Sequence, residues 1–341
     1  MDKSKPILSH MLWLNDMRII AAIAIIIVHV SQPFTDLMKE KDFIEWWTPN
    51  LYLSIHMWGV PVFVMISGAL LLTCEREYAS TSSFYKKRLN RLFLPVLFWT
   101  IIYLIVQYFK SKSLGITFGF HELQQMLLEG RPYYHMWYLY MVPGLYLVTP
   151  YIRKIIKYLS RKKLIVLAFI LMILSMIATN YTDPHSQPVF IMMFPFYLGY
   201  FLTGYLISTS EIKIPVKNLI ILLIILAIAI TLGEYNFPDH FKSNFSITMI
   251  FMAITLMFIV KKIHGKIPIN SNIRNKLATF SLGAYLIHPA VLIVIRKMHY
   301  FGLNTEDNLW ILIPFITFVT TAISVMIAYI FSKIPFLKKV I

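Results

Sequence analysis

Two ionisable side chains share one apolar segment near the start of this 341-residue sequence, where charge is costly. Arg18 and His29 lie eleven residues apart. On an α-helix, eleven residues turn about 20° beyond three full turns and rise about 16 Å, so both side chains share one face. The imidazole of His29 suits proton transfer near neutral pH and predicts a general base. The alternative is a packing histidine that is hydrogen-bonded to a neighbouring helix.

Three further charged groups lie at helix ends. Arg88 and Arg91 are spaced i, i+3, which places two guanidiniums on one helix face, and guanidinium forks suit phosphate. Ordinary anchoring by basic residues at a membrane surface explains them equally. Asp16 precedes Arg18 and is placed to cap the first apolar helix or to hold the arginine.

Aromatic residues and histidines gather in two other segments. Tyr133, His135, Trp137 and Tyr140 lie at the end of an apolar segment, where aromatic faces beside a histidine suit sugar binding. Membrane-interface anchoring by aromatic rings is the alternative. His288 lies midway through a later apolar segment, directly before a proline, and both a structural and a substrate-binding role are open for it.

The elements that position these residues follow from the composition. Hydrophobic residues make up 58% of the chain, charged residues only 14%, and the mean hydropathy is +0.66, which excludes a soluble globular protein. We predict an all-α bundle of about ten transmembrane helices in a single domain, residues 1–341. The ten apolar segments are 18–35, 50–72, 92–109, 136–152, 164–180, 188–208, 218–233, 245–260, 277–295 and 308–331.

The placement of the basic residues predicts the orientation. Of 32 Lys and Arg residues, 24 lie at the two ends of the chain or in alternate loops. This asymmetry predicts cytoplasmic termini in a multi-pass protein of the cell (inner, cytoplasmic) membrane. It also explains the net charge of +16 through contact with membrane lipids, without nucleic acid as a partner.

Two other chemistries find no support in the sequence. Ser67-Gly68 lacks a nucleophile-elbow pattern and reads as a point of close helix packing, because small residues line helix contacts in membranes. No cluster of His, Cys and carboxylate residues has metal-ligand spacing, so we predict no bound metal.

Five blocks together resemble acyltransferase family 3, the membrane-bound O-acyltransferases of bacterial surface polysaccharides. They follow the family order over about residues 12–300. Ile19 departs from the glycine that is usual after the first arginine, which leaves the Arg18–His29 spacing intact. The blocks are Arg18-x10-His29, Met65-Ile-Ser-Gly-Ala-Leu-Leu71, Arg88-Leu-Asn-Arg91 with Leu94-Pro95, Met136-Trp-Tyr-Leu-Tyr140 with Tyr146-Leu-Val-Thr-Pro150, and Tyr285-Leu-Ile-His-Pro289.

The resemblance implies transfer of an acyl group, most simply acetyl, from cytoplasmic acyl-CoA to a hydroxyl of a cell-surface polysaccharide or its lipid-linked precursor. It implies that Arg88 and Arg91 hold the CoA phosphates and that Arg18 holds the donor or orients its path. His29 then acts as general base or brief acyl carrier, and acetyl-CoA is a substrate rather than a permanently bound cofactor. The sequence is similar to the stand-alone members, which have no extracellular hydrolase-like domain.

Two other functions remain open. A transporter or flippase of a lipid-linked glycan also fits proline-interrupted helices and buried polar groups. Against it, the sequence shows no inverted repeat and few acidic residues in the apolar segments. A sensor or scaffold built on an inactive acyltransferase is the third possibility, and the presence of both Arg18 and His29 argues against it.

Overall fold

The structure is a computed structural model that describes residues 12–37, 43–73, 80–181, 189–238, 240–266, 270–298 and 308–341. All the elements within these ranges are helical, as the composition predicts. The α-helices are α2 (Trp13–Leu37), α3 (Phe43–Ser54), α4 (Gly59–Thr73), α5 (Thr81–Ser113), α6 (Phe120–Glu129), α7 (Trp137–Tyr158), α8 (Arg161–Tyr181), α9 (Leu198–Ser208), α10 (Val216–Asn236), α11 (Ile247–Ile263), α12 (Ser271–Lys297) and α13 (Leu309–Lys333). Two 3-10 helices, η1 (Phe190–Tyr197) and η3 (Leu337–Val340), complete them.

Seven helical stretches of the described residues are long and apolar enough to cross a membrane. They comprise α2, α3 with α4, α5, α8, α10, α12 and α13. The other three predicted spans are helical but fall short. α9 has only 11 residues after η1, α11 has 17, and α7 carries basic residues towards its end. The prediction of ten spans is therefore confirmed for seven, in a helical bundle of the multi-pass membrane type.

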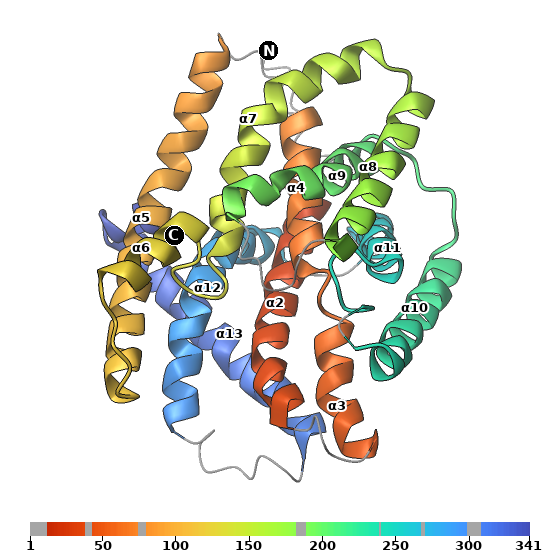
Figure 1. Cartoon of the computed structure of the whole chain (residues 1–341). Coiled ribbons are helices and arrows are strands. Elements are labelled where there is room, and N and C mark those ends of the chain that lie inside the picture. The colour runs from red at the N-terminus through yellow and green to blue at the C-terminus, as the bar shows by residue number, and fades with distance from the viewer. Residues whose placement is uncertain are drawn as a thin grey trace.

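Helix α2 lies at the centre of the bundle and belongs to both of its hydrophobic cores (Figure 1). The first half of α2, up to Ala24, packs with α4 and α11 in the core to which α9 also belongs. The second half, from Ile25, packs with α12 and α13. Arg18 and His29 therefore lie on one helix but in two different environments.

Helices α4 and α9 make the most extensive contact of the bundle. Gly68 of α4 lies against the backbone of Phe201, and Gly204 of α9 lies against the backbone of Met65. In each case a Cβ atom would overlap a backbone carbonyl. The prediction of close packing at Ser67-Gly68 is thus confirmed, because only glycine lets the two backbones approach this far.

In three helices, a proline leaves a backbone carbonyl without its helical donor, and a side chain donates a hydrogen bond to that carbonyl instead. A proline has no N–H, so the carbonyl four residues earlier loses its helical donor. In α13, Pro314 frees the Trp310 carbonyl, and the Tyr52 hydroxyl donates to it at 3.2 Å. The same arrangement recurs in α2 and α12 within the functional site.

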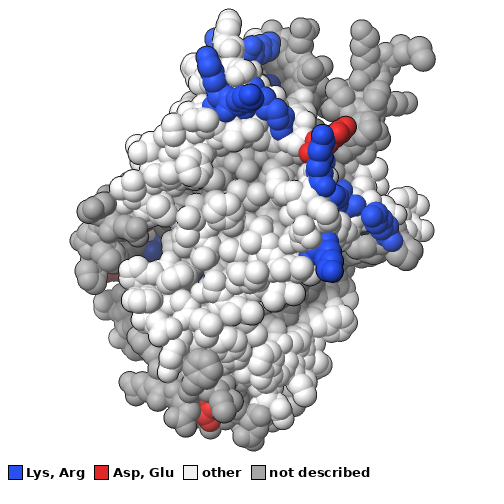
Figure 2. Space-filling model, turned by 90° about the vertical axis from the view of Figure 1, so that its right-hand side faces the viewer, with Lys and Arg blue, Asp and Glu red and all other residues white. Residues whose placement is uncertain are grey.

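Lys and Arg side chains gather towards one end of the face shown in Figure 2, and the opposite end of that face is nearly free of them. This distribution agrees with the asymmetry of basic residues between alternate loops. We keep the cytoplasmic placement of the basic end as a prediction.

Candidate functional site

Three histidines from distant parts of the sequence meet inside the bundle. His29 comes from α2, His135 from the turn before α7, and His288 from α12. The ring centroids of His29 and His288 lie 5.3 Å apart with nearly parallel planes, and those of His135 and His288 lie 5.4 Å apart. The ring of Tyr134 packs against His29 at 4.5 Å. The structure therefore brings together three of the predicted site residues.

The members of this histidine cluster (His29, His135 and His288) differ in accessibility. His29 and Tyr134 are half-buried, whereas His135 is 1% exposed and His288 is fully buried. His29 is therefore the most exposed residue of the three, and the other two histidines are buried. This difference favours His29 as the ring that meets the substrate.

The orientation of His288 is fixed by the proline that follows it. Pro289 frees the Tyr285 carbonyl, and the His288 Nδ1 atom lies 2.6 Å from that oxygen. A carbonyl oxygen only accepts, so Nδ1 carries the hydrogen and donates. In the neutral ring the lone pair is then on Nε2, which is buried and has no hydrogen-bond partner in the structure. The cluster thus holds an imidazole with a defined tautomer.

Replacement of Pro289 tests this tautomer. Pro289→Ala restores an N–H that competes for the Tyr285 carbonyl, so we expect the single Nδ1–H tautomer of His288 to become a mixture. 15N NMR of histidine-labelled protein in nanodiscs, with the signal assigned through His288→Gln, reads the tautomer directly. Pro314→Ala in α13 is the matched control and leaves the signal unchanged. An unaltered His288 signal in Pro289→Ala contradicts this assignment.

A second group of charges surrounds the other end of α2. Arg18, Arg88 and Arg91 all lie within electrostatic range of Tyr146 on α7, and Arg18 lies within range of Arg91. Arg88 is half-buried and Arg91 is exposed. In the described residues no ion pair joins a carboxylate to Arg18 or Arg91. Arg18 and Arg91 repel each other, so the arginine cluster (Arg18, Arg88 and Arg91) around Tyr146 is suited to an anion.

Asp16 does not pair with Arg18, in contrast to one of the two roles expected for it. Its carboxylate lies 2.7 Å from the Arg274 Nε atom and 2.6 Å from the His264 Nδ1 atom. Arg18 instead donates to the Asn15 side chain at 3.3 Å, and Asn15 donates to Asn275 at 3.0 Å. The start of α2 is therefore tied to the start of α12, and Arg18 is left to face the other arginines.

Tyrosines connect the arginine cluster with the histidine cluster. Tyr146 and Tyr138 of α7 interact electrostatically with each other and with Arg18. Tyr138 also interacts with Ser67 of α4, and its ring lies 6.2 Å from Tyr285. The Tyr285 hydroxyl donates to the His135 carbonyl. Polar groups therefore continue through the apolar bundle from one cluster to the other.

The remaining predicted residues lie at different distances from the histidines. Tyr133 is buried and stacks on Tyr103 at 4.7 Å, with His135 at 5.9 Å. Trp137 packs its ring near Tyr197, and the Tyr140 hydroxyl lies 2.7 Å from the Thr100 hydroxyl. No ring contact among the described residues joins Trp137 or Tyr140 to the histidine cluster. A role of Trp137 and Tyr140 in substrate binding stays a prediction.

Sequence reasoning missed Tyr134, Tyr285 and Arg296. Tyr134 is in ring contact with His29, whereas the neighbouring Tyr133 is the site residue that the sequence predicts. Arg296 donates from Nη2 to the His29 carbonyl at 2.8 Å. The signal that points to this bond is Pro33, four residues after His29, because it predicts a carbonyl in need of a donor.

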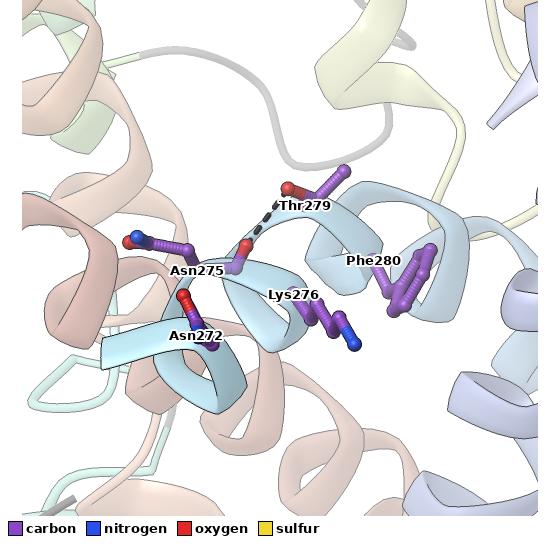
Figure 3. Close-up of a pocket in the computed structure, with 5 residues that line it drawn as sticks. All are labelled: Asn272, Asn275, Lys276, Thr279 and Phe280. Atoms are coloured by element: carbon purple, nitrogen blue, oxygen red, sulfur yellow. Dashed lines mark hydrogen bonds between the residues drawn. The ribbon is translucent and has the colours of Figure 1, made fainter. Parts of the chain in front are cut away.

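A surface groove of about 370 Å³ lies on the first turns of α12, away from the histidine cluster (Figure 3). None of the predicted site residues lines it. Asn275 in its wall is the residue that bonds Asn15. Among the described residues, no group of three or more His, Cys, Asp or Glu side chains is arranged to hold a metal ion. The groove is lined by Asn272, Asn275, Lys276, Thr279 and Phe280.

Comparison with known proteins identifies the family. The family model described as an acyltransferase domain, that of acyltransferase family 3, matches residues 11–329. No curated protein and no solved structure matches the chain. The match includes α2, with Arg18 and His29, and α12, with His288. Because it extends over nearly the whole sequence, the chain belongs to acyltransferase family 3, a family of membrane acyltransferases.

Proposed function

We propose that this protein is an O-acetyltransferase of the cell membrane. It moves an acetyl group from cytoplasmic acetyl-CoA to a hydroxyl of a cell-surface polysaccharide or of its lipid-linked precursor. The observation that carries the proposal is that α2 holds Arg18 in the arginine cluster and His29 in the histidine cluster. One cluster suits the phosphates of CoA, and the other suits proton transfer.

The donor end of the reaction follows from charge. Arg88 and Arg91 bind the CoA phosphates at the basic end of the bundle, and Arg18 holds the donor above them. Guanidinium forks match phosphate geometry, and an anion relieves the repulsion between Arg18 and Arg91. The pantetheine arm then follows the polar groups that lead from Tyr146 to His29.

The acceptor end uses the half-buried imidazole. His29 accepts the proton of the acceptor hydroxyl as the hydroxyl oxygen attacks the thioester carbonyl carbon. The C–S bond breaks, CoA leaves as a thiolate, and the thiolate takes up a proton. Tyr134 packs on His29 and borders the side that an acceptor sugar reaches, and the buried Tyr133 and His135 support that side from behind. His288 lies behind His29 and keeps the ring stacked.

Binding of the donor tests the assignment directly. We expect Arg88→Ala/Arg91→Ala to weaken binding of acetyl-CoA by at least about 10-fold, because each lost charge-assisted contact to phosphate is worth about 1.5–3 kcal/mol. Titration of purified protein in nanodiscs measures the affinity. Lys162→Ala/Lys163→Ala, which removes two exposed charges from the start of α8, is the matched control. Absence of binding by monodisperse wild-type protein contradicts the acetyl-CoA assignment.

A further inference from the structure

Arg296 connects the end of α12 with the histidine cluster. Its Nη2 atom donates at 2.8 Å to the carbonyl of His29, the carbonyl that Pro33 leaves without a helical donor. A basic residue at the end of a membrane helix usually anchors the helix at the interface. Lys297 beside it is exposed and fits that role, whereas Arg296 is half-buried and turned towards α2.

The charge of Arg296 has no carboxylate partner within the part of the chain that the structure describes. It interacts electrostatically with the half-buried His29 and Tyr134 and with the buried Tyr133 beside them. None of these side chains supplies a negative charge. A half-buried guanidinium whose described neighbours are neutral is suited to an anionic ligand.

The donors of the guanidinium point to the same conclusion. Arginine carries five N–H donors in a planar fork, and among the described residues Arg296 makes one hydrogen bond, to the His29 carbonyl. The remaining donors suit the two oxygens of a carboxylate or phosphate. Because Arg296 is bonded to the backbone of His29, such an anion is held close to the reacting atoms.

We propose that Arg296 binds an anionic group, a carboxylate or a phosphate, carried by the substrate next to the atom that reacts at His29. The inference rests on the proposed function. Two parts of the reaction supply such an anion. The acyl group can end in a carboxylate, or the acceptor can carry a carboxylate or phosphate near its reacting hydroxyl. The chemistry at Arg296 is the same in both cases.

Binding of two donors tests the first source. Succinyl-CoA differs from acetyl-CoA by a terminal carboxylate on the acyl group. If the acyl group carries the anion, wild-type protein in nanodiscs binds succinyl-CoA about 10- to 100-fold more tightly than acetyl-CoA, and Arg296→Gln removes this preference. Arg296→Lys, which keeps the charge but not the fork, retains part of it. Lys297→Gln is the matched control and retains all of it.

Competition by sugars tests the second source. The assay uses membranes of cells that produce the protein and measures transfer of label from radioactive acetyl-CoA to the glycan of these membranes. If the acceptor carries the anion, glucuronate or glucose 1-phosphate inhibits this transfer at least about 10-fold more strongly than glucose does. Arg296→Gln again removes the preference and Lys297→Gln keeps it. Equal behaviour of charged and neutral probes in both assays overturns the proposal.

A double variant separates anion binding from support of the α2 backbone. Pro33→Ala restores an N–H for the His29 carbonyl and so replaces the bond that Arg296 makes. If Arg296 only satisfies that carbonyl, Pro33→Ala/Arg296→Gln recovers wild-type transfer, and the proposal is wrong. We expect transfer by the double variant to remain at the level of Arg296→Gln. Failure of the acyltransferase assignment itself is distinguishable, because wild-type protein then binds neither donor and transfers no label.

Discussion

His29→Ala is expected to lower the rate of acyl transfer by about 10²- to 10⁴-fold, the range for loss of a positioned general base. His29 is the one histidine of the cluster that is not buried, and the proposed mechanism makes it the general base. Membranes that contain the variant, supplied with radioactive acetyl-CoA, give the rate from the label in the glycan fraction. The affinity for acetyl-CoA is expected to be unchanged, because the arginine cluster lies at the other end of α2.

Two comparisons sharpen this test. His121→Ala removes an exposed histidine on α6 and is expected to leave the rate unchanged. Incubation of wild-type protein with labelled acetyl-CoA, without acceptor, distinguishes a general base from an acyl carrier. A carrier retains label on the protein and loses it in His29→Gln, whereas a base retains none. Transfer at the wild-type rate by His29→Ala rules out both roles.

Gly68→Val is expected to prevent assembly of the bundle. The added side chain overlaps the carbonyl of Phe201 in the backbone of α9, which cannot rotate away as a side chain does. Overpacking in a protein core typically costs about 1–3 kcal/mol, and a clash with backbone lies at or above the upper end. Thermal unfolding of the purified protein in detergent, followed by tryptophan fluorescence, measures the loss. We expect a large fall in the melting temperature or no monodisperse protein.

The reciprocal contact supplies an independent check. Gly204→Val overlaps the Met65 carbonyl from the other side of the same interface and is expected to have an equal effect. Gly119→Ala, where the nearest atom is the mobile end of Glu122, is the matched control and changes stability little. A folded, wild-type-like Gly68→Val protein contradicts the close contact of α4 with α9.

Local sequence patterns predicted much of this fold. Apolar length predicted the long helices, and the eleven-residue spacing placed Arg18 and His29 on one face. The number of spans is confirmed only in part, since the segment 188–208 begins as a 3-10 helix and leaves 11 residues for α9. Hydrophobicity alone does not distinguish a full span from a short helix buried in the bundle.

The composition of the site was harder to predict. His29 and His288 lie far apart in the sequence, so their stacking depends on how α2 packs against α12. Tyr133 and Tyr134 lie in a turn before α7, where no regular period indicates which ring faces inward. Arg296 resembles an ordinary interfacial anchor, and its role emerges only once Pro33 and the His29 carbonyl are seen beside it.

The bonds between α2 and α12 hold Arg18 and His29 at a fixed distance from each other along the bundle. Asp16 is paired with Arg274 near the start of α12, and the His29 carbonyl is bonded to Arg296 near its end. Helix α2 is thus attached to α12 at two points, one near Arg18 and one at His29. An extra residue inserted between Arg18 and His29 rotates His29 by about 100° and lifts it by about 1.5 Å. On the proposed mechanism, a donor is therefore selected partly by reach. A thioester whose linker is shorter than the pantetheine of CoA does not extend to the imidazole of His29, even when the arginines bind its anionic group.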